Sequence, residues 1–221
     1  TPGGLRITAD DTNPDRIGVD VRNGATANKS YRAKMGDYYT GSIKGVINYG
    51  YSNFKLMAQE PSLPTLIETP IVREATSIVP AQDKLTIGTY NVENFTVSTP
   101  DSKVTKIADA IVNKMKNPDI IGLNEIQDNN GETNDGTVDG TQSAQKIIDK
   151  VKALGGPTYA YTEITPANNQ DGGAPGGNIR VAFLYNSARV SLTQGAAKGT
   201  ATKAVGYENG KLTLNPGRID P

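Results

Sequence analysis

Two segments of the chain carry apolar residues at helical spacing. One set occupies positions i, i+3, i+4, i+7, i+8 and i+11 of an amphipathic helix: Val104, Ile107, Ala108, Ile111, Val112 and Met115. Asp101 or Ser102 is expected to cap the start of this helix, and Asn117 followed by Pro118 to end it. The second helix is predicted by Ala144, Ile147, Ile148, Val151 and Leu154.

Short apolar runs without a helical period predict strands around these helices. The runs are KLTIGTY (84–90), DIIGL (119–123), TYAYTEI (158–164), NIRVAFLY (178–185) and RVSL (189–192), the last two joined as a hairpin. Strand 84–90, the first helix and strand 119–123 form a βαβ unit, whose two strands are expected to be parallel. Residues 128–140 are expected to form a polar, glycine-rich loop.

The N-terminal part of the chain has a different pattern. Residues 1–60 contain only short β-like segments separated by Gly, Asn and Asp, which predicts a small, partly open β-barrel-like unit. Four prolines then favour an extended linker or a strand-like arm over residues 61–83. The expected class is therefore α/β (α+β), with the α/β domain at residues 84–221.

The amino-acid composition excludes several kinds of catalytic and binding site. The chain has 23 basic and 23 acidic residues, so polyanion binding requires local patches. It has no histidine, which excludes serine–histidine triads and histidine acid–base catalysis within these residues, and no cysteine for thiolate metal sites. Its apolar runs are far shorter than the roughly 20 residues of a membrane span, so no membrane partner is expected.

Polar side chains follow both strands of the predicted βαβ unit. Asn91 lies at the exit of the first strand and Glu125 at the exit of the second. Because parallel strands end at the same sheet edge, the two side chains are expected to converge there. A carboxylate beside a carboxamide suits Mg²⁺, Mn²⁺ or Ca²⁺, although both residues could also simply cap the strand ends. Glu93 is expected to be an exposed strand-end residue, or else to assist from outside the ligand shell.

Three segments together resemble the endonuclease/exonuclease/phosphatase superfamily, in particular its secreted bacterial nucleases: LTIGTYNVENF (85–95), PDIIGLNEIQDN (118–129) and GGNIRVAFLYNSARV (176–190). The resemblance implies the front half of a four-layer α/β sandwich of mixed sheets. It also implies that Glu125 is the principal ligand of Mg²⁺ (or Mn²⁺ or Ca²⁺). Asn91 would contact the metal shell and the scissile phosphate, and Asn178 and Arg180 would lie near substrate phosphate.

The resemblance extends to the N-terminal unit, which is similar to the oligonucleotide-binding (OB) type of barrel that precedes the catalytic domain in those nucleases. Its aromatic residues would either stack on bases or fill a small barrel core: Tyr38, Tyr39, Tyr49, Tyr51 and Phe54. Lys44 and Lys55 would contact phosphates.

The superfamily normally adds an Asn–Asp pair, a histidine and a final Asp–His pair downstream, and none of these follows here. The expectation is therefore a fragment of a metal-dependent extracellular nuclease, inactive without the missing half of its domain, with DNA favoured over RNA as partner. Phosphomonoesterase or phospholipase activity on the same scaffold is one alternative. A non-catalytic nucleic-acid-binding module is the other.

Overall fold

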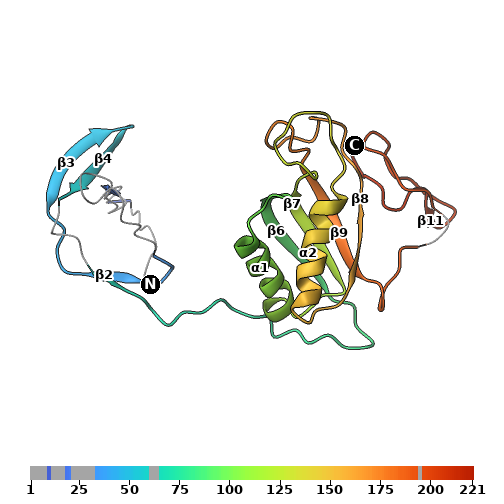
Figure 1. The fold of residues 1–221 in the computed structure, drawn as a ribbon, viewed down its shortest axis with the longest axis horizontal. Coiled ribbons are helices and arrows are strands. Elements are labelled where there is room, and N and C mark those ends of the chain that lie inside the picture. Colours follow the sequence, from blue (N-terminus) through green and yellow to red (C-terminus); the bar gives the residue numbers. More distant parts are fainter. Residues whose placement is uncertain (1–8, 11–17, 21–32, 60–64, 194–195) are drawn as a thin grey trace. The chain divides into compact units, whose positions relative to one another are not determined.

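The protein is described by a computed structural model, and the chain divides into two compact units, residues 1–73 and 74–221 (Figure 1). The described residues are 9–10, 18–20, 33–59, 65–193 and 196–221. Both helices and strands are present, so the protein belongs to the mixed α/β class.

A four-stranded sheet forms the centre of the second unit. Its order is β6 (Ile87–Phe95), β7 (Ile120–Ile126), β9 (Arg180–Asn186) and β8 (Tyr159–Glu163). Strands β6 and β7 are parallel, as predicted for the βαβ unit, whereas β9 is antiparallel to both of its neighbours. The carboxyl ends of β6 and β7 and the amino end of β9 therefore meet at one edge of the sheet (Figure 1).

The helices lie where the apolar periodicity predicted them. Helix α1 (Asp101–Asp109) continues into a π-helical turn, η2 (Ala110–Lys114), and α2 spans Thr141–Ala153. The π turn was not predicted, because one inserted residue barely disturbs a helical apolar pattern. No helix in the described ranges is long and apolar enough to cross a lipid bilayer.

The core lies between one face of the sheet and the two helices (Figure 1). Strands β7 and β9 contribute Ile121, Leu123, Ala182 and Leu184, which pack with the apolar faces of α1 and α2. Alternation along each strand puts the intervening side chains on the opposite face. There Ile87, Val181 and Phe183 remain substantially exposed, so the sheet is covered on one face only.

An ion pair fastens the amino end of the parallel strands. Arg189, just after β9, pairs through Nε with Oδ1 of Asp119, whose side chain is buried. Oδ2 of Asp119 accepts hydrogen bonds from the backbone N–H and hydroxyl of Thr86 at 2.8 and 2.9 Å. Burial acts to raise the pKa of Asp119, but these hydrogen bonds outweigh it and hold the pKa below its ordinary value.

One predicted strand is wrong. Residues 189–192 form no strand, because Asn186 turns the chain away from the sheet. Its carbonyl accepts the N–H groups of Arg189 at 2.9 Å and Val190 at 3.0 Å. A short antiparallel pair that the pattern did not predict, β10 (Tyr207–Glu208) and β11 (Lys211–Leu212), follows later.

The first unit is built from short strands. They are β1 (Gly18–Asp20), β2 (Tyr38–Thr40), β3 (Gly45–Gly50), β4 (Asn53–Ala58) and β5 (Thr65–Ile67). They form one sheet of order β1-β4-β3 and a separate β2-β5 pair, and no closed barrel is present among the described residues. Part of the β-like segments expected within residues 1–60 falls in 1–8, 11–17 and 21–32, which lie outside the described residues.

Leu123→Ala should destabilise the protein by about 3 kcal/mol, because the side chain is completely buried at the centre of the sheet. Val181→Ala, on the open face of neighbouring β9, should cost less than about 1 kcal/mol. Urea unfolding followed by circular dichroism measures both. An equal loss of unfolding free energy in the two variants would contradict a core that lies on one face of the sheet only.

Asp119→Asn should lower stability at neutral pH and matter little in acid. A carboxyl group whose pKa is depressed by folding contributes stability above its unfolded pKa, about 3.9, and loses it as the pH falls through the folded value. The difference in urea midpoint between wild type and D119N should therefore shrink from about pH 5 downward. A difference that stays constant down to pH 2 would show that the ion pair does not depress this pKa.

Candidate functional site

The polar residues expected at the sheet edge lie in two irregular stretches of strand pairing. Strands β6 and β7 pair regularly up to Asn91 opposite Asn124, and pairing resumes only at Phe95 opposite Ile126. Three residues of β6 thus face the single residue Glu125 of β7. Pairing between β7 and β9 also shifts between Leu123 and Ile126. Such bulges re-aim side chains and are frequent beside active sites.

Three residues with a left-handed backbone lie at the same place. Glu93, Asn94 and Glu125 have φ angles of 54°, 48° and 61°, in the left-handed region that non-glycine residues rarely adopt. Each such residue costs of order 1 kcal/mol and persists only where the surrounding structure holds it. These three residues lie around the predicted metal site.

The structure brings Asn91 and Glu125 together. The Asn91 amide nitrogen, Nδ2, donates a hydrogen bond to Oε1 of Glu125 at 2.7 Å. The Asn91 amide oxygen accepts the backbone N–H of Glu93 at 2.8 Å, which fixes which end of the amide faces the carboxylate. Asn91 is thereby placed to orient Glu125.

The donor set at this edge fits a hard divalent cation. Within the described part of the chain, Oε2 of Glu125 makes no hydrogen bond and the carboxylate has no cationic partner. The amide oxygen of Asn91 keeps a second lone pair beside it. No cluster of three acidic side chains that could hold a metal occurs among the described residues. Mg²⁺ commonly takes one or two protein carboxylates and keeps several waters, so such a sparse shell is compatible with it.

Glu93 turns toward a lysine. Nζ of Lys103, from the first turn of α1, lies 3.0 Å from Oε2 of Glu93 and 2.7 Å from its carbonyl oxygen. The Glu93 carboxylate is exposed, as one of the two expectations for it stated. The Glu93 carboxylate therefore forms an ion pair with Lys103 at the rim of the site.

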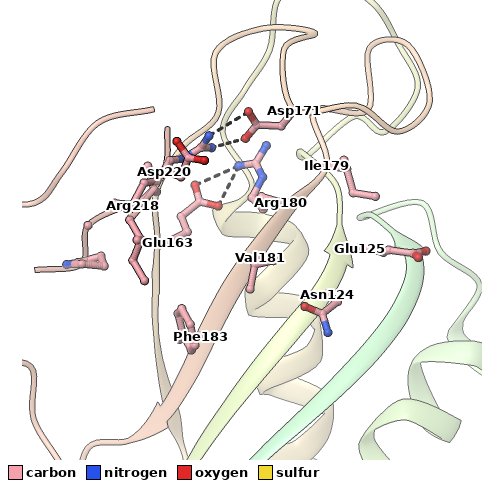
Figure 2. A pocket seen from close by; sticks show the side chains of 14 residues that line it. Asn124, Glu125, Glu163, Asp171, Ile179, Arg180, Val181, Phe183, Arg218 and Asp220 are labelled. Atoms are coloured by element: carbon pink, nitrogen blue, oxygen red, sulfur yellow. Dashed lines mark hydrogen bonds and ion pairs between the residues drawn. The ribbon is translucent and has the colours of Figure 1, made fainter. Parts of the chain in front are cut away.

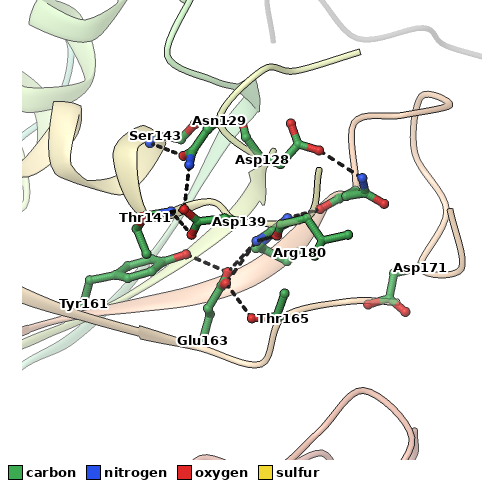
Figure 3. A network of polar contacts seen from close by, with 12 residues as sticks. Asp128, Asn129, Asp139, Thr141, Ser143, Tyr161, Glu163, Thr165, Asp171 and Arg180 are labelled. Carbon is green, nitrogen blue, oxygen red and sulfur yellow. Dashed lines mark hydrogen bonds and ion pairs between the residues drawn. The ribbon is translucent and has the colours of Figure 1, made fainter. Parts of the chain in front are cut away.

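Arg180 lies in a buried ion pair. Its Nη1 is 3.0 Å from both carboxylate oxygens of Glu163, and only 1% of the Arg180 side chain is exposed (Figure 3). The same nitrogen donates to the Val138 carbonyl at 2.7 Å, while Nε and Nη2 donate to the Asn178 carbonyl at 3.0 and 2.8 Å. The phosphate contact expected of Arg180 stays a prediction, and this geometry does not favour it.

Glu163 has two further donors. The Tyr161 hydroxyl donates to Oε2 at 2.6 Å and the Thr165 hydroxyl to Oε1 at 3.1 Å (Figure 3). Burial, with the neighbouring Glu163 carboxylate, raises the pKa of Tyr161 far above its ordinary value. The phenol therefore remains a protonated hydrogen-bond donor at any physiological pH.

Asn178 is also buried, and its side chain is hydrogen-bonded to several neighbouring segments. Its side-chain nitrogen donates to Asp128 Oδ2 at 2.9 Å and to the Thr137 and Gly176 carbonyls at 2.7 and 3.0 Å. Its oxygen accepts the Asn169 N–H at 2.8 Å. This geometry connects two loops at the sheet edge, and the substrate contact expected of Asn178 stays a prediction.

Sequence reasoning missed the structural role of the polar loop after β7. Oδ1 of Asn129 accepts the backbone N–H groups of Gln142 and Ser143 at 2.8 and 3.2 Å and so caps α2 from outside the helix (Figure 3). The Ser143 hydroxyl donates to the Asp128 carbonyl at 2.8 Å. The only sequence signal for this cap was the pair Asp128 and Asn129 shortly after β7. The residue that Asn129 caps, Gln142, lies 13 residues further along the chain, so the contact could not be read from local sequence.

A cavity of about 760 Å³ opens beside Glu125 (Figure 2). Val181 and Phe183 line it from the open face of β9, and Arg218 lines it from the C-terminal segment. Arg218 pairs with Asp171 through two hydrogen bonds, one of them 3.0 Å long. The sequence did not indicate this cavity, because its walls come from segments far apart along the chain.

Comparison with known proteins adds one match, and it lies outside this site. A family model described as a domain of unknown function (DUF8508) matches residues 1–68, within the first unit. No curated protein matches the chain, and neither does any solved structure. The match covers less than a third of the 221 residues and carries no activity for the chain.

Proposed function

We propose that the second unit carries the metal-binding part of a nuclease that hydrolyses nucleic-acid phosphodiester bonds, with DNA as the favoured substrate. The observation that carries the proposal is the 2.7 Å hydrogen bond between Asn91 and Glu125, made across two bulged strand ends. Oε2 of Glu125, which has no hydrogen-bond partner among the described residues, supports it, as does the resemblance of residues 85–190 to the endonuclease/exonuclease/phosphatase superfamily. The front half of a four-layer sandwich and an extracellular location are parts of the same proposal.

In this proposal Glu125 holds the cation, Mg²⁺ or alternatively Mn²⁺ or Ca²⁺. A bound divalent cation would stabilise negative charge on the phosphate and the leaving oxygen. Asn91 orients the Glu125 carboxylate through Nδ2, and its amide lies at the edge where a phosphate would bind. Lys103 lies at the rim of the site, where it is paired with Glu93.

The chain lacks histidine, so the proton transfers of phosphodiester hydrolysis have no imidazole donor or acceptor here. The proposal therefore assigns them to chain beyond these 221 residues. We expect this chain alone to bind the cation without cutting DNA, and a longer product of the same gene to cut it.

Glu125→Gln should weaken Mn²⁺ binding by about tenfold or more, because a neutral amide replaces the carboxylate that is proposed to hold the cation. Glu93→Gln is the matched control: it removes a carboxylate from the same edge, but one that is engaged by Lys103. Its Mn²⁺ affinity should stay within about twofold of wild type. Isothermal titration calorimetry measures all three proteins, and equal affinities of wild type and E125Q would contradict a metal role for Glu125.

The catalytic part of the proposal is tested by plasmid nicking with Mg²⁺, Mn²⁺ or Ca²⁺. The longer gene product should nick DNA, its E125Q variant should lose activity by about 10³-fold, and the 221-residue chain should be inactive. A longer product that binds metal but hydrolyses only phosphomonoesters or phospholipids would assign the scaffold to those activities instead.

A second candidate function belongs to the first unit, where we propose single-stranded nucleic-acid binding by the β3–β4 hairpin. Tyr49 and Phe54 pair across the two strands, with ring centroids 4.9 Å apart, and are 62% and 66% exposed. Tyr51, in the turn, is 94% exposed, and the Lys55 ammonium lies 5.2 Å from its ring centroid. Exposed rings beside a cation suit unstacked bases and their phosphates, and this supports binding without catalysis.

Replacing Tyr49 and Phe54 by alanine should weaken binding of a labelled oligothymidylate by about tenfold, because base–aromatic stacking contributes of order 1–3 kcal/mol per base. Val46→Ala, an equally exposed but non-aromatic position of β3, should leave affinity unchanged. Fluorescence anisotropy at several salt concentrations measures both, and affinity should fall as salt rises. Unchanged binding by the double variant would exclude the hairpin as the binding surface.

A further inference from the structure

We propose that Arg180 is a positioning residue for the metal site at Glu125. Its guanidinium holds the amino end of β9 and the loop after β7 together, and so maintains the bulge from which Glu125 projects. This inference rests on the proposed metal role of Glu125. It gives Arg180 a function at the site that requires no contact with substrate or metal.

The bulge in β7 determines which face of the sheet Glu125 uses. Ile121 and Leu123 point into the helix-covered core, and in a regular strand Glu125 would follow them two residues later. Instead Ile126 is the next core residue, and Glu125 adopts a φ of 61°. Without the extra residue, the carboxylate would face the apolar core, where burial of a charge is unfavourable.

Regular pairing resumes immediately after Glu125, at the pair Ile126 and Arg180. The next backbone N–H groups are fixed as well: Gln127 donates to the Phe95 carbonyl at 2.7 Å and Asp128 to the Gly177 carbonyl at 3.1 Å. The residue after the strained position is therefore held from both neighbouring strands. The amino end of β9 is one of the two supports.

Arg180 is the group that fixes this end of β9. Its guanidinium connects β8, through Glu163, to the loop after β7, through the Val138 carbonyl, and to its own strand start, through the Asn178 carbonyl. Removing it would leave the Glu163 carboxylate buried without a cation and two carbonyls without their donor. Buried groups without their partners destabilise the folded protein. The surrounding segments would shift so that these groups reach water or other partners.

The chain also leaves room for this guanidinium. A Cβ at Gly140 would lie 2.7 Å from Nη1 of Arg180, closer than side chains tolerate. Gly140 has a φ of −112°, which alanine adopts without strain. Gly140→Ala would therefore displace the guanidinium while keeping both charges of the ion pair.

Arg189 at the opposite end of the same strand supplies the matched control. It also pairs with a buried aspartate, Asp119, and also donates to backbone carbonyls, those of Ala81 and Lys84 at 2.8 Å. Its loss should reduce stability but leave the bulge at Glu125 intact. A purely structural role for Arg180 would make the two arginines equivalent in every measurement.

The experiment compares Mn²⁺ affinity by calorimetry in wild type, Arg180→Met, Gly140→Ala and Arg189→Met, each at a temperature where circular dichroism shows it folded. Mutation of residues that support metal ligands typically costs 10–100-fold in affinity. R180M should lose about tenfold or more, G140A should lose affinity in the same direction, and R189M should stay within about twofold.

Wild-type affinity in a folded R180M or, if R180M does not fold, in G140A would overturn the positioning role. So would an equal loss in R189M, because affinity would then simply follow stability. Equal Mn²⁺ affinities of wild type and E125Q would overturn the proposed metal role itself, and the positioning role with it. The comparison of wild type with E125Q thus distinguishes an error in the metal role of Glu125 from an error in the positioning role of Arg180 alone.

Discussion

The pairing of β6 with β7 is the constraint on which the candidate site depends. A parallel pair joined through a helix must bring both carboxyl ends to one sheet edge. Asn91 and Glu125 meet there because pairing is regular up to Asn91 and interrupted just beyond it. The interruption stores strain at Glu93, Asn94 and Glu125, and the surrounding hydrogen bonds hold it in place.

Two arginines hold the central antiparallel strand, one at each end. Arg189 joins the amino end of β7 to the chain before β6, through Asp119. Arg180 joins the candidate-site end to β8 and to the loop after β7, through Glu163 and Val138. Both arginines use a buried carboxylate together with backbone carbonyls, a combination that the planar guanidinium fits well. The site edge is therefore held by polar contacts, whereas the middle of the sheet is held by apolar packing.

The charged side chains near the cavity differ in whether they have a partner. The two arginines beside the cavity are each neutralised by a carboxylate, Arg180 by Glu163 and Arg218 by Asp171. The Glu125 carboxylate has no protein cation as a partner in the described part of the chain, so in the proposed site the metal ion would supply the positive charge beside it. In the first unit, exposed rings offer binding surface that requires no large net charge.

Much of the second unit follows from local pattern. The two helices, the parallel strands and the convergence of Asn91 with Glu125 were predictable, because apolar periodicity and strand order depend on neighbouring residues. Arg180 shows the limit of that reasoning. The resemblance of its segment to the superfamily suggested a phosphate contact, yet two of its partners are Glu163, 17 residues away, and the Val138 carbonyl, 42 residues away.

The sequence by itself determined the two helices and the four strands of the central sheet in the second unit, and the edge at which its polar residues gather, since helix and strand periods are read over a few residues. It did not determine the loss of the strand at 189–192, the left-handed conformation of Glu125 or the burial of Arg180. Only the tertiary structure decided these. The missing strand follows from the turn at Asn186, whereas the other two depend on which distant backbone groups and carboxylates become neighbours when the sheet forms, and no local pattern records that.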